Sequence, residues 1–155
     1  QDYGLLSRNG RALLEIDRLA NLLFSIHMWW PAKWSGGTYA GAQERVIAAL
    51  ADAQERNLPL VVGEFGAAFT DAGELHEQDR IAWPTILEEC ARREVGWLAW
   101  SWGAVPSKPQ TDLDMAPDGK FSGLRGWGRE VVLEHEFCLA NTSVQSAYMA
   151  GFAVE

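Results

Sequence analysis

The stretch that decides the fold lies in the middle of the chain and reads Leu58-Pro59-Leu60-Val61-Val62-Gly63-Glu64-Phe65-Gly66. A short, unbroken apolar run is typical of a parallel strand that is buried on both faces. This run stops at Glu64, which stands between Gly63 and Gly66. Glycines remove bulk and let the backbone turn away, so Glu64 is predicted to point into open space. The alternative interpretation is an ordinary glutamate at a strand end that faces water.

Size and composition narrow the classes of protein. The chain has 155 residues, of which 48% are hydrophobic and 22% charged, so one domain with a substantial core is expected. A net charge of -8 leaves no basic face for phosphates, which argues against nucleic acid and anionic membrane surfaces. No apolar run approaches the roughly 20 residues of a membrane span. The first residues, Gln1-Asp2-Tyr3-Gly4, show no leader and read as though a strand had just ended.

Tryptophan, cysteine and histidine give further hints. Eight Trp residues are many for this length, and either core packing or a platform for carbohydrate would use them. Cys90 and Cys138 show neither metal nor redox spacing, and Cys90 is predicted to be a buried thiol on the apolar side of a helix. The three His residues are scattered without ligand spacing, so no metal and no cofactor is expected.

Helices and strands alternate along the chain. A short helix through Ile16 is predicted to be capped by Ser7 or Asn9. Further helices are expected over 39–56, from Trp83 to Cys90 with Pro84 in a first turn or a kink, and over 126–133. The strands are expected over 21–26, 58–65 and 95–102, with a long loop over 103–122. Residues 1–137 are assigned to this domain, and 138–155 to a C-terminal tail of unknown role.

This alternation predicts an α/β fold with a parallel sheet, whose sites lie at the carboxyl ends of the strands. His27, Glu64, Trp100 and Trp102 all stand at such ends and are expected to line one cleft. Each has a plainer interpretation alone, a core position for His27 and for either Trp. Together they favour a sugar site, in which indoles stack on a pyranose, a carboxylate acts at the anomeric carbon and an imidazole binds hydroxyls.

The ordered set of three segments resembles the last three strands of glycoside hydrolase family 5, as in its bacterial β-mannanases and cellulases. The segments are Phe24-Ser25-Ile26-His27-Met28, Val61-Val62-Gly63-Glu64-Phe65-Gly66 and Trp97-Leu98-Ala99-Trp100-Ser101-Trp102. The resemblance covers about residues 1–133 and implies part of a (β/α)8 barrel, strands 6 to 8, with hydrolysis that retains configuration. It also implies that Glu64 is the nucleophile, that His27 borders the subsite of the cleaved sugar and that Trp100 forms its floor.

Two departures from the family pattern affect the site. The family usually has a Tyr two residues after the His, whose hydroxyl bonds the nucleophile, whereas this chain has Trp29, whose indole N–H can also donate. Trp29 and Trp30 therefore join His27, Trp100 and Trp102 as candidate substrate-binding residues. The second departure concerns the acid/base carboxylate, which the family takes from an Asn-Glu-Pro segment. This chain contains no such segment. Another chain is one possible source, and an unusual carboxylate from the loops is another: Asp71, Glu74, Glu77, Asp112 or Asp114.

Three functions stay open at this point. The first is an endo-acting glycoside hydrolase on β-1,4-mannan or β-1,4-glucan, the second a polysaccharide-binding module without catalysis, and the third an inactive fragment kept soluble by association. A partial barrel leaves two open sheet edges, so copies are expected to pair into a homo-oligomer, or the tail to fold over the sheet. The polymeric substrates of the family imply an extracellular location.

Overall fold

The computed structural model describes residues 3–69, 76–103, 113–144 and 146. The predicted alternation of helices and strands is confirmed. The longer elements are α1 (Tyr3–Ile16), β1 (Phe24–His27), α2 (Tyr39–Glu55), β2 (Leu60–Phe65), α3 (Trp83–Arg93) and β3 (Gly96–Ala99). The shorter ones are η1 (Ala32–Trp34), η2 (Glu77–Asp79), η3 (Phe121–Gly123), α4 (Gly126–Arg129), η4 (Glu130–Glu134, a π-helical turn) and α5 (Leu139–Thr142).

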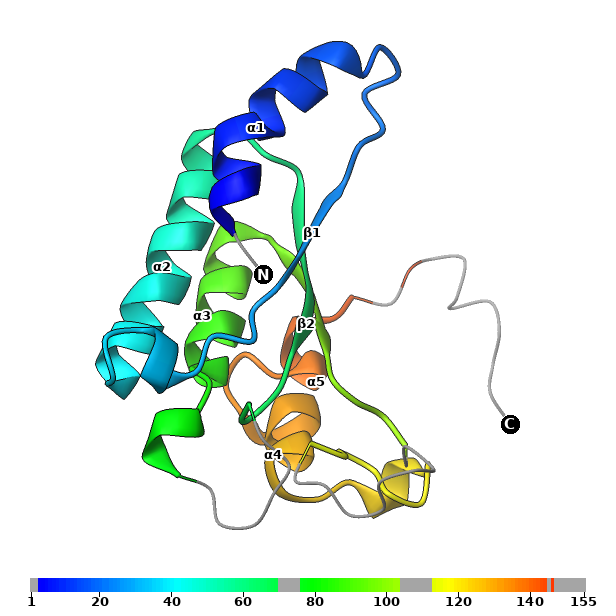
Figure 1. Ribbon diagram of the computed structural model, residues 1–155. Coiled ribbons are helices and arrows are strands. Elements are labelled where there is room, and N and C mark those ends of the chain that lie inside the picture. The colour runs from blue at the N-terminus through cyan, green and yellow to red at the C-terminus, as the bar shows by residue number, and fades with distance from the viewer. Residues whose placement is uncertain (1–2, 70–75, 104–112, 145, 147–155) are drawn as a thin grey trace.

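The three strands form one parallel sheet in the order β1-β2-β3. Ser25 lies opposite Val61, and Val62 lies opposite Trp97. Figure 1 shows α2 and α3 side by side along the sheet, as the right-handed connections of parallel strands require. The prediction of an α/β fold with parallel strands is therefore correct.

Only one face of the sheet is well packed. Leu60, Val62 and Phe65 of β2 are buried in the core that α2 and α3 complete. On the other face, Ser25 is exposed and Leu98 is 61% exposed. Within the described ranges no strand extends the sheet beyond β1 or β3. The sheet thus has an open face and two open edges in this part of the chain.

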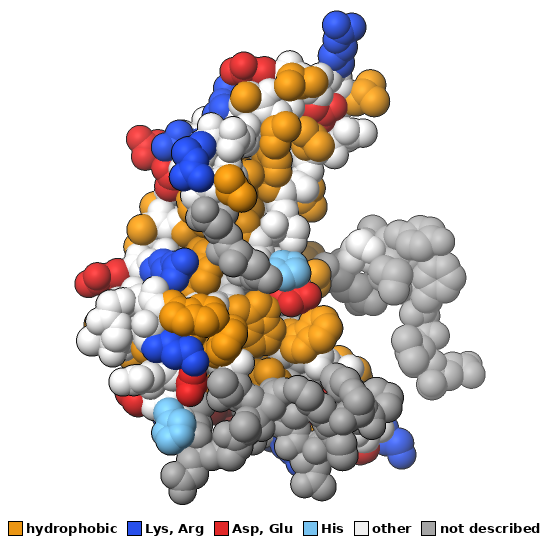
Figure 2. All heavy atoms as spheres, viewed as in Figure 1, with side chains coloured by type: hydrophobic (Ala, Val, Ile, Leu, Met, Phe, Trp, Pro, Cys, Tyr) orange, Lys and Arg blue, Asp and Glu red, His pale blue; other side chains and the backbone are white. Residues whose placement is uncertain are grey.

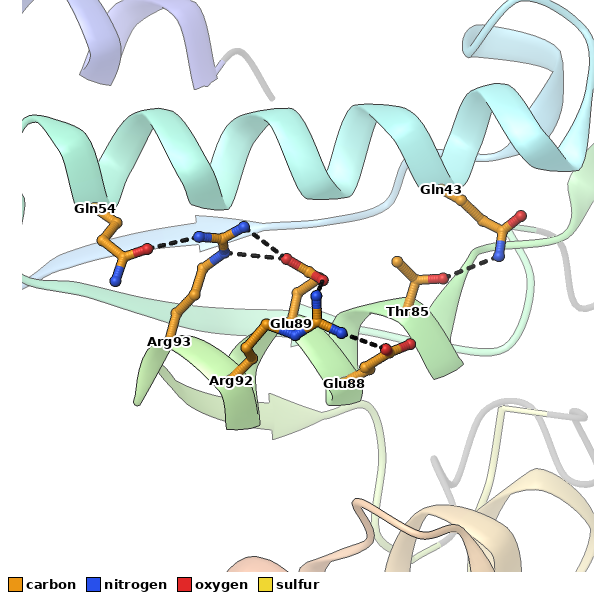
Figure 3. A network of polar contacts seen from close by, with 7 residues as sticks. All are labelled: Gln43, Gln54, Thr85, Glu88, Glu89, Arg92 and Arg93. Carbon is orange, nitrogen blue, oxygen red and sulfur yellow. Dashed lines mark hydrogen bonds and ion pairs between the residues drawn. The ribbon is translucent and has the colours of Figure 1, made fainter.

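A network of polar side chains joins α2 to α3 over this core (Figure 3). Arg93 donates from Nε and Nη2 to Oε2 of the buried Glu89, at 3.0 and 2.8 Å, and from Nη1 to Gln54 of α2 at 2.6 Å. Arg92 approaches the other oxygen of Glu89 at 3.3 Å. Because both oxygens of Glu89 have a cationic partner, the carboxylate can stay buried between the helices.

The first helix begins earlier than expected, at Tyr3, so Ser7 and Asn9 lie inside α1 and do not cap it. The Ser7 and Tyr3 hydroxyls instead donate to Asp52 Oδ2 of α2, each at 2.8 Å. Burial acts to raise the pKa of the Asp52 carboxyl, but hydrogen bonds from Ser7, Tyr3 and Arg56 hold that pKa below its ordinary value. These bonds attach α1 to α2.

All three predicted strands are longer than the strands observed, and β2 begins at Leu60 rather than at Leu58. Residues 21–23 are outside β1, because the Asp17 carboxylate accepts the amide hydrogens of Asn21 and Leu22. At the other end of the sheet, β3 stops at Ala99, so Trp100 and Trp102 follow the strand.

The structure also tests predictions made for single residues. Pro84 sits in the first turn of α3, as predicted.

The Cys90 and Cys138 thiols are free and buried, and burial raises the pKa of Cys90 to about 12. In the predicted tail, α5 packs against η4, while residues 145 and 147–155 lie outside the described part, so the boundary at 137 stays a prediction. No helix in the described residues is long and apolar enough to cross a membrane.

Candidate active site

One extra residue in β2 turns Glu64 out of the core. Regular alternation would place Glu64 on the same side as Leu60 and Val62, which are buried. The pairing with β1 shifts after Ile26, so that Ile26 lies opposite Val62 but His27 lies opposite Glu64. The pairing with β3 shifts over the same part of β2. This bulge lets Phe65 return to the core and leaves the Glu64 side chain 29% exposed beside His27.

Glu64 meets two neighbours through one oxygen. The Trp29 indole donates from Nε1 to Glu64 Oε2 at 3.1 Å, and His27 Nδ1 lies 3.2 Å from the same atom. Met28, between these two residues, is fully buried and donates from its backbone N to the Glu64 carbonyl at 2.8 Å. The strand end therefore fixes both neighbours around the carboxyl group. No hydrogen bond to Oε1 comes from the residues that the structure describes, so this oxygen can reach a ligand.

The two glycines near Glu64 leave room for neighbouring side chains. A Cβ atom on Gly63 would lie 2.1 Å from Ser25 Oγ, and one on Gly66 would lie 2.8 Å from the Trp29 ring. Gly66 therefore makes room for the indole that bonds Glu64. Ser25, which the sequence analysis did not single out, lies on the open face two residues before His27, and period-two alternation along β1 is the signal that finds it.

Trp100 and Trp102 follow β3 at the same edge of the sheet. The Trp100 backbone N donates to the Phe65 carbonyl at 2.8 Å, which places Trp100 next to the end of β2, and its side chain is 44% exposed. The peptide bond from Trp100 to Ser101 is cis. Trp102 stacks on Phe121 at 6.5 Å between ring centroids and donates from Nε1 to the Gly119 carbonyl. Both indoles are open enough to receive a ligand.

Trp30 does not fit its predicted role in binding substrate. Its side chain is only 4% exposed, and the Arg45 guanidinium lies 4.6 Å from the centre of its ring. A sugar cannot stack on a ring that is enclosed in this way. Trp30 faces the core because it continues the alternation of β1, in which Ile26 and Met28 are buried on the same side.

The candidate acid/base residues fall into two groups. Asp71, Glu74 and Asp112 lie outside the described residues. Glu77 is exposed on η2 near Arg80, with 3.7 Å between their charged groups. Asp114 is 3% exposed, and its Oδ1 accepts from the Ala116 amide while Oδ2 has no hydrogen-bond partner among the described residues. Neither Glu77 nor Asp114 shares a hydrogen-bond partner with the Glu64 carboxylate.

A groove borders the site between β1 and the start of α1. Its volume is about 390 Å³, and it is lined by Tyr3, Leu5, Leu6, Ser25, Ile26, His27 and a small part of Trp30. Figure 2 shows hydrophobic side chains gathered in the middle of this face, beside His and acidic side chains. Apolar walls with a few convergent polar groups are typical of small-molecule sites. In the described ranges, no group of three or more His, Cys, Asp and Glu residues could hold a metal ion.

The fold and the site define a parallel α/β protein with a carboxyl group, an imidazole and indoles at the carboxyl edge of its sheet. Comparisons with known proteins agree with this class. Residues 9–105 match the family model of cellulases of glycosyl hydrolase family 5. The chain therefore belongs to glycoside hydrolase family 5, and its sheet is part of a (β/α)8 barrel.

The sequences of known relatives align with most of this chain. It is 35% identical over 123 residues to a mannan endo-1,4-beta-mannosidase of Salipaludibacillus agaradhaerens, which is 79% of this chain and 35% of that protein. A corresponding enzyme of Cellvibrio japonicus is 27% identical, over 97% of this chain and 31% of its own length. The chain thus spans about a third of these relatives.

The fold is also similar to solved structures. A beta-mannanase from Streptomyces thermolilacinus superposes with a TM-score of 0.74 at 29% identity, over 96% of this chain and 44% of that one. The same protein has been solved with mannohexaose, and that structure is 28% identical to this chain.

Proposed function

We propose that this chain carries the nucleophile side of a site that hydrolyses β-1,4-mannan with retention of configuration. Glu64 is the nucleophile, and the contacts of its Oε2 with Trp29 and His27 are the observation that carries this proposal. In such a reaction the free oxygen attacks the anomeric carbon and forms a glycosyl-enzyme, which water then hydrolyses. The mannanase relatives favour mannan over glucan as the substrate.

The surrounding residues have supporting roles in this proposal. Trp29 and His27 hold the carboxylate in the orientation for attack, and His27 also reaches sugar hydroxyls. Trp100 supplies the floor on which the sugar at Glu64 stacks, and Trp102 extends that aromatic surface. A retaining site also needs a second carboxylate about 5 to 5.5 Å from the nucleophile. Because this chain contains no Asn-Glu-Pro segment, the proposal takes this carboxylate either from a second chain or from one of the loop residues Asp71, Glu74 and Asp112.

The experiment uses a substrate that needs little help from an acid. A dinitrophenyl β-mannobioside has a leaving group stable enough to depart unprotonated, so Glu64 alone can form the glycosyl-enzyme. We expect a burst of dinitrophenolate that approaches one equivalent of protein, and none from Glu64→Gln. On soluble mannan, which needs protonation, the rate should be about 10²- to 10⁴-fold lower than that of a complete site.

Glu88→Gln is the matched control, because it makes the same change at an exposed carboxylate on α3 that has no role in the site. It should keep the burst. A binding module without catalysis is the second candidate, since Trp29 and the exposed Trp100 and Trp102 lie at the carboxyl edge of the sheet and no acid/base is identified among the described residues. Equal binding of mannan by the wild type and Glu64→Gln, with no burst from either, would favour that candidate.

A further inference from the structure

A second pair of aromatic side chains lies away from Glu64, on the loops that follow β1 and β2. Trp34 of η1 is 54% exposed, and Phe69 is 37% exposed. Their ring centroids are 4.3 Å apart, with the planes at 64°. Lys33 places its ammonium 5.6 Å from the centre of the Trp34 ring and 4.9 Å from that of Phe69. Exposed aromatic surface of this kind is expensive to leave in water unless a ligand covers it.

The buried residue Asp79 holds this cluster in place. Its carboxylate accepts a hydrogen bond from Lys33 Nζ at 2.5 Å, and its backbone carbonyl accepts from the Phe69 amide at 2.9 Å. Arg45 of α2 also donates to the Trp34 backbone carbonyl, at 3.1 Å. Both aromatic residues are therefore fixed by the backbone before any ligand arrives, which lowers the entropy cost of binding.

The chemistry of the cluster suits a sugar ring. A pyranose presents apolar C–H groups that pack on an indole, and hydroxyls around its edge that accept hydrogen bonds from an ammonium group. The Lys33 side chain is 32% exposed, so its remaining hydrogens can reach such hydroxyls. A nucleotide or an acidic ligand fits less well, because Asp79 already neutralises Lys33.

The position of the cluster relates it to Glu64. Phe69 comes five residues after Glu64, and Trp34 five residues after Trp29, which bonds Glu64. Five residues span at most about 18 Å, so both rings lie within reach of an oligosaccharide of a few sugars bound at Glu64. We propose that Trp34, Phe69 and Lys33 form a distal platform for another pyranose of the same β-linked chain. This inference rests on the proposed function.

Binding of short and long ligands tests the distal platform. All proteins carry Glu64→Gln, so that the ligands stay intact, and titration calorimetry follows mannobiose and mannohexaose. We expect the parent to bind mannohexaose more tightly than mannobiose. Trp34→Ala should weaken mannohexaose binding by about three- to tenfold, because one stacking contact is lost, and leave mannobiose unchanged. Leu13→Ala is the control, since Leu13 is similarly exposed at 47% but lies on α1.

The possible results separate the two proposals. If Trp34→Ala and Phe69→Ala both bind mannohexaose as tightly as the parent, the distal platform is wrong while the function at Glu64 stands. If the parent binds neither ligand, the proposed function is wrong and the platform is wrong with it. Phe69→Ala also serves where circular dichroism shows that Trp34→Ala has not folded.

Discussion

Trp29 stands where the family usually has a Tyr, and the structure shows that it keeps the hydrogen bond. The two residues reach the nucleophile differently, because an indole is larger than a phenol and donates from the side of its ring. The extra volume is accommodated at Gly66, where a Cβ atom would meet the Trp29 ring at 2.8 Å. Trp29 and Gly66 therefore work as a pair in this chain.

Trp29→Phe removes the N–H donor from this contact and keeps an aromatic ring, although a smaller one. A hydrogen bond to a carboxylate is worth about 1.5 to 3 kcal/mol, so the burst with the dinitrophenyl substrate should be about 10- to 100-fold slower. Trp29→Tyr restores a donor and should recover a large part of the rate. An equally fast burst from Trp29→Phe would show that the hydrogen bond has no role in attack.

At the scale of elements, the bulge in β2 and the contact between α2 and α3 matter most. Because of the bulge, Val62 and Phe65 pack in the core while Glu64 lies on the open face of the sheet. The helices α2 and α3 pack against β2 in the core. Glu89 of α3, which is buried with two arginine partners, stabilises the contact between them. A defect at Glu89 should therefore loosen the layer that supports the site.

Glu89→Ala leaves the arginines without their buried partner and should lower the free energy of unfolding by about 3 kcal/mol. Urea unfolding followed by tryptophan fluorescence measures this loss. Glu88→Ala is the matched control on the same helix: Glu88 pairs with Arg92 at 2.6 Å but is 45% exposed. Its loss should not exceed about 0.5 kcal/mol. Similar losses for both variants would contradict the role given to the buried network.

At the scale of the whole molecule, the open face of the sheet is the main feature. Leu98 is 61% exposed in the middle of β3, and the outer edges of β1 and β3 are unpaired within the described residues. Unpaired strand edges and exposed apolar surface both favour association. The relatives are much longer than this chain, so in them further sequence accompanies the matched part.

We predict that the isolated chain self-associates through this face. Light scattering after size exclusion should give a mass that rises with protein concentration, and Leu98→Glu should shift the equilibrium toward the monomer because it puts charge on the face. Leu13→Ala, on α1, should leave the mass unchanged. A compact monomer at every concentration would contradict the prediction.

The sequence by itself determined the order of helices and strands, the parallel sheet, and Glu64, His27 and Trp29 as residues at its carboxyl edge. These features follow from periodicity and from strand ends, which are local properties of the chain. Only the tertiary structure decided which side chains meet. Alternation along β2 would have put Glu64 in the core, and nothing local marks Trp34 as exposed. The physical reason is that one extra residue in β2 changes the register against both neighbouring strands, and register depends on packing across the whole sheet.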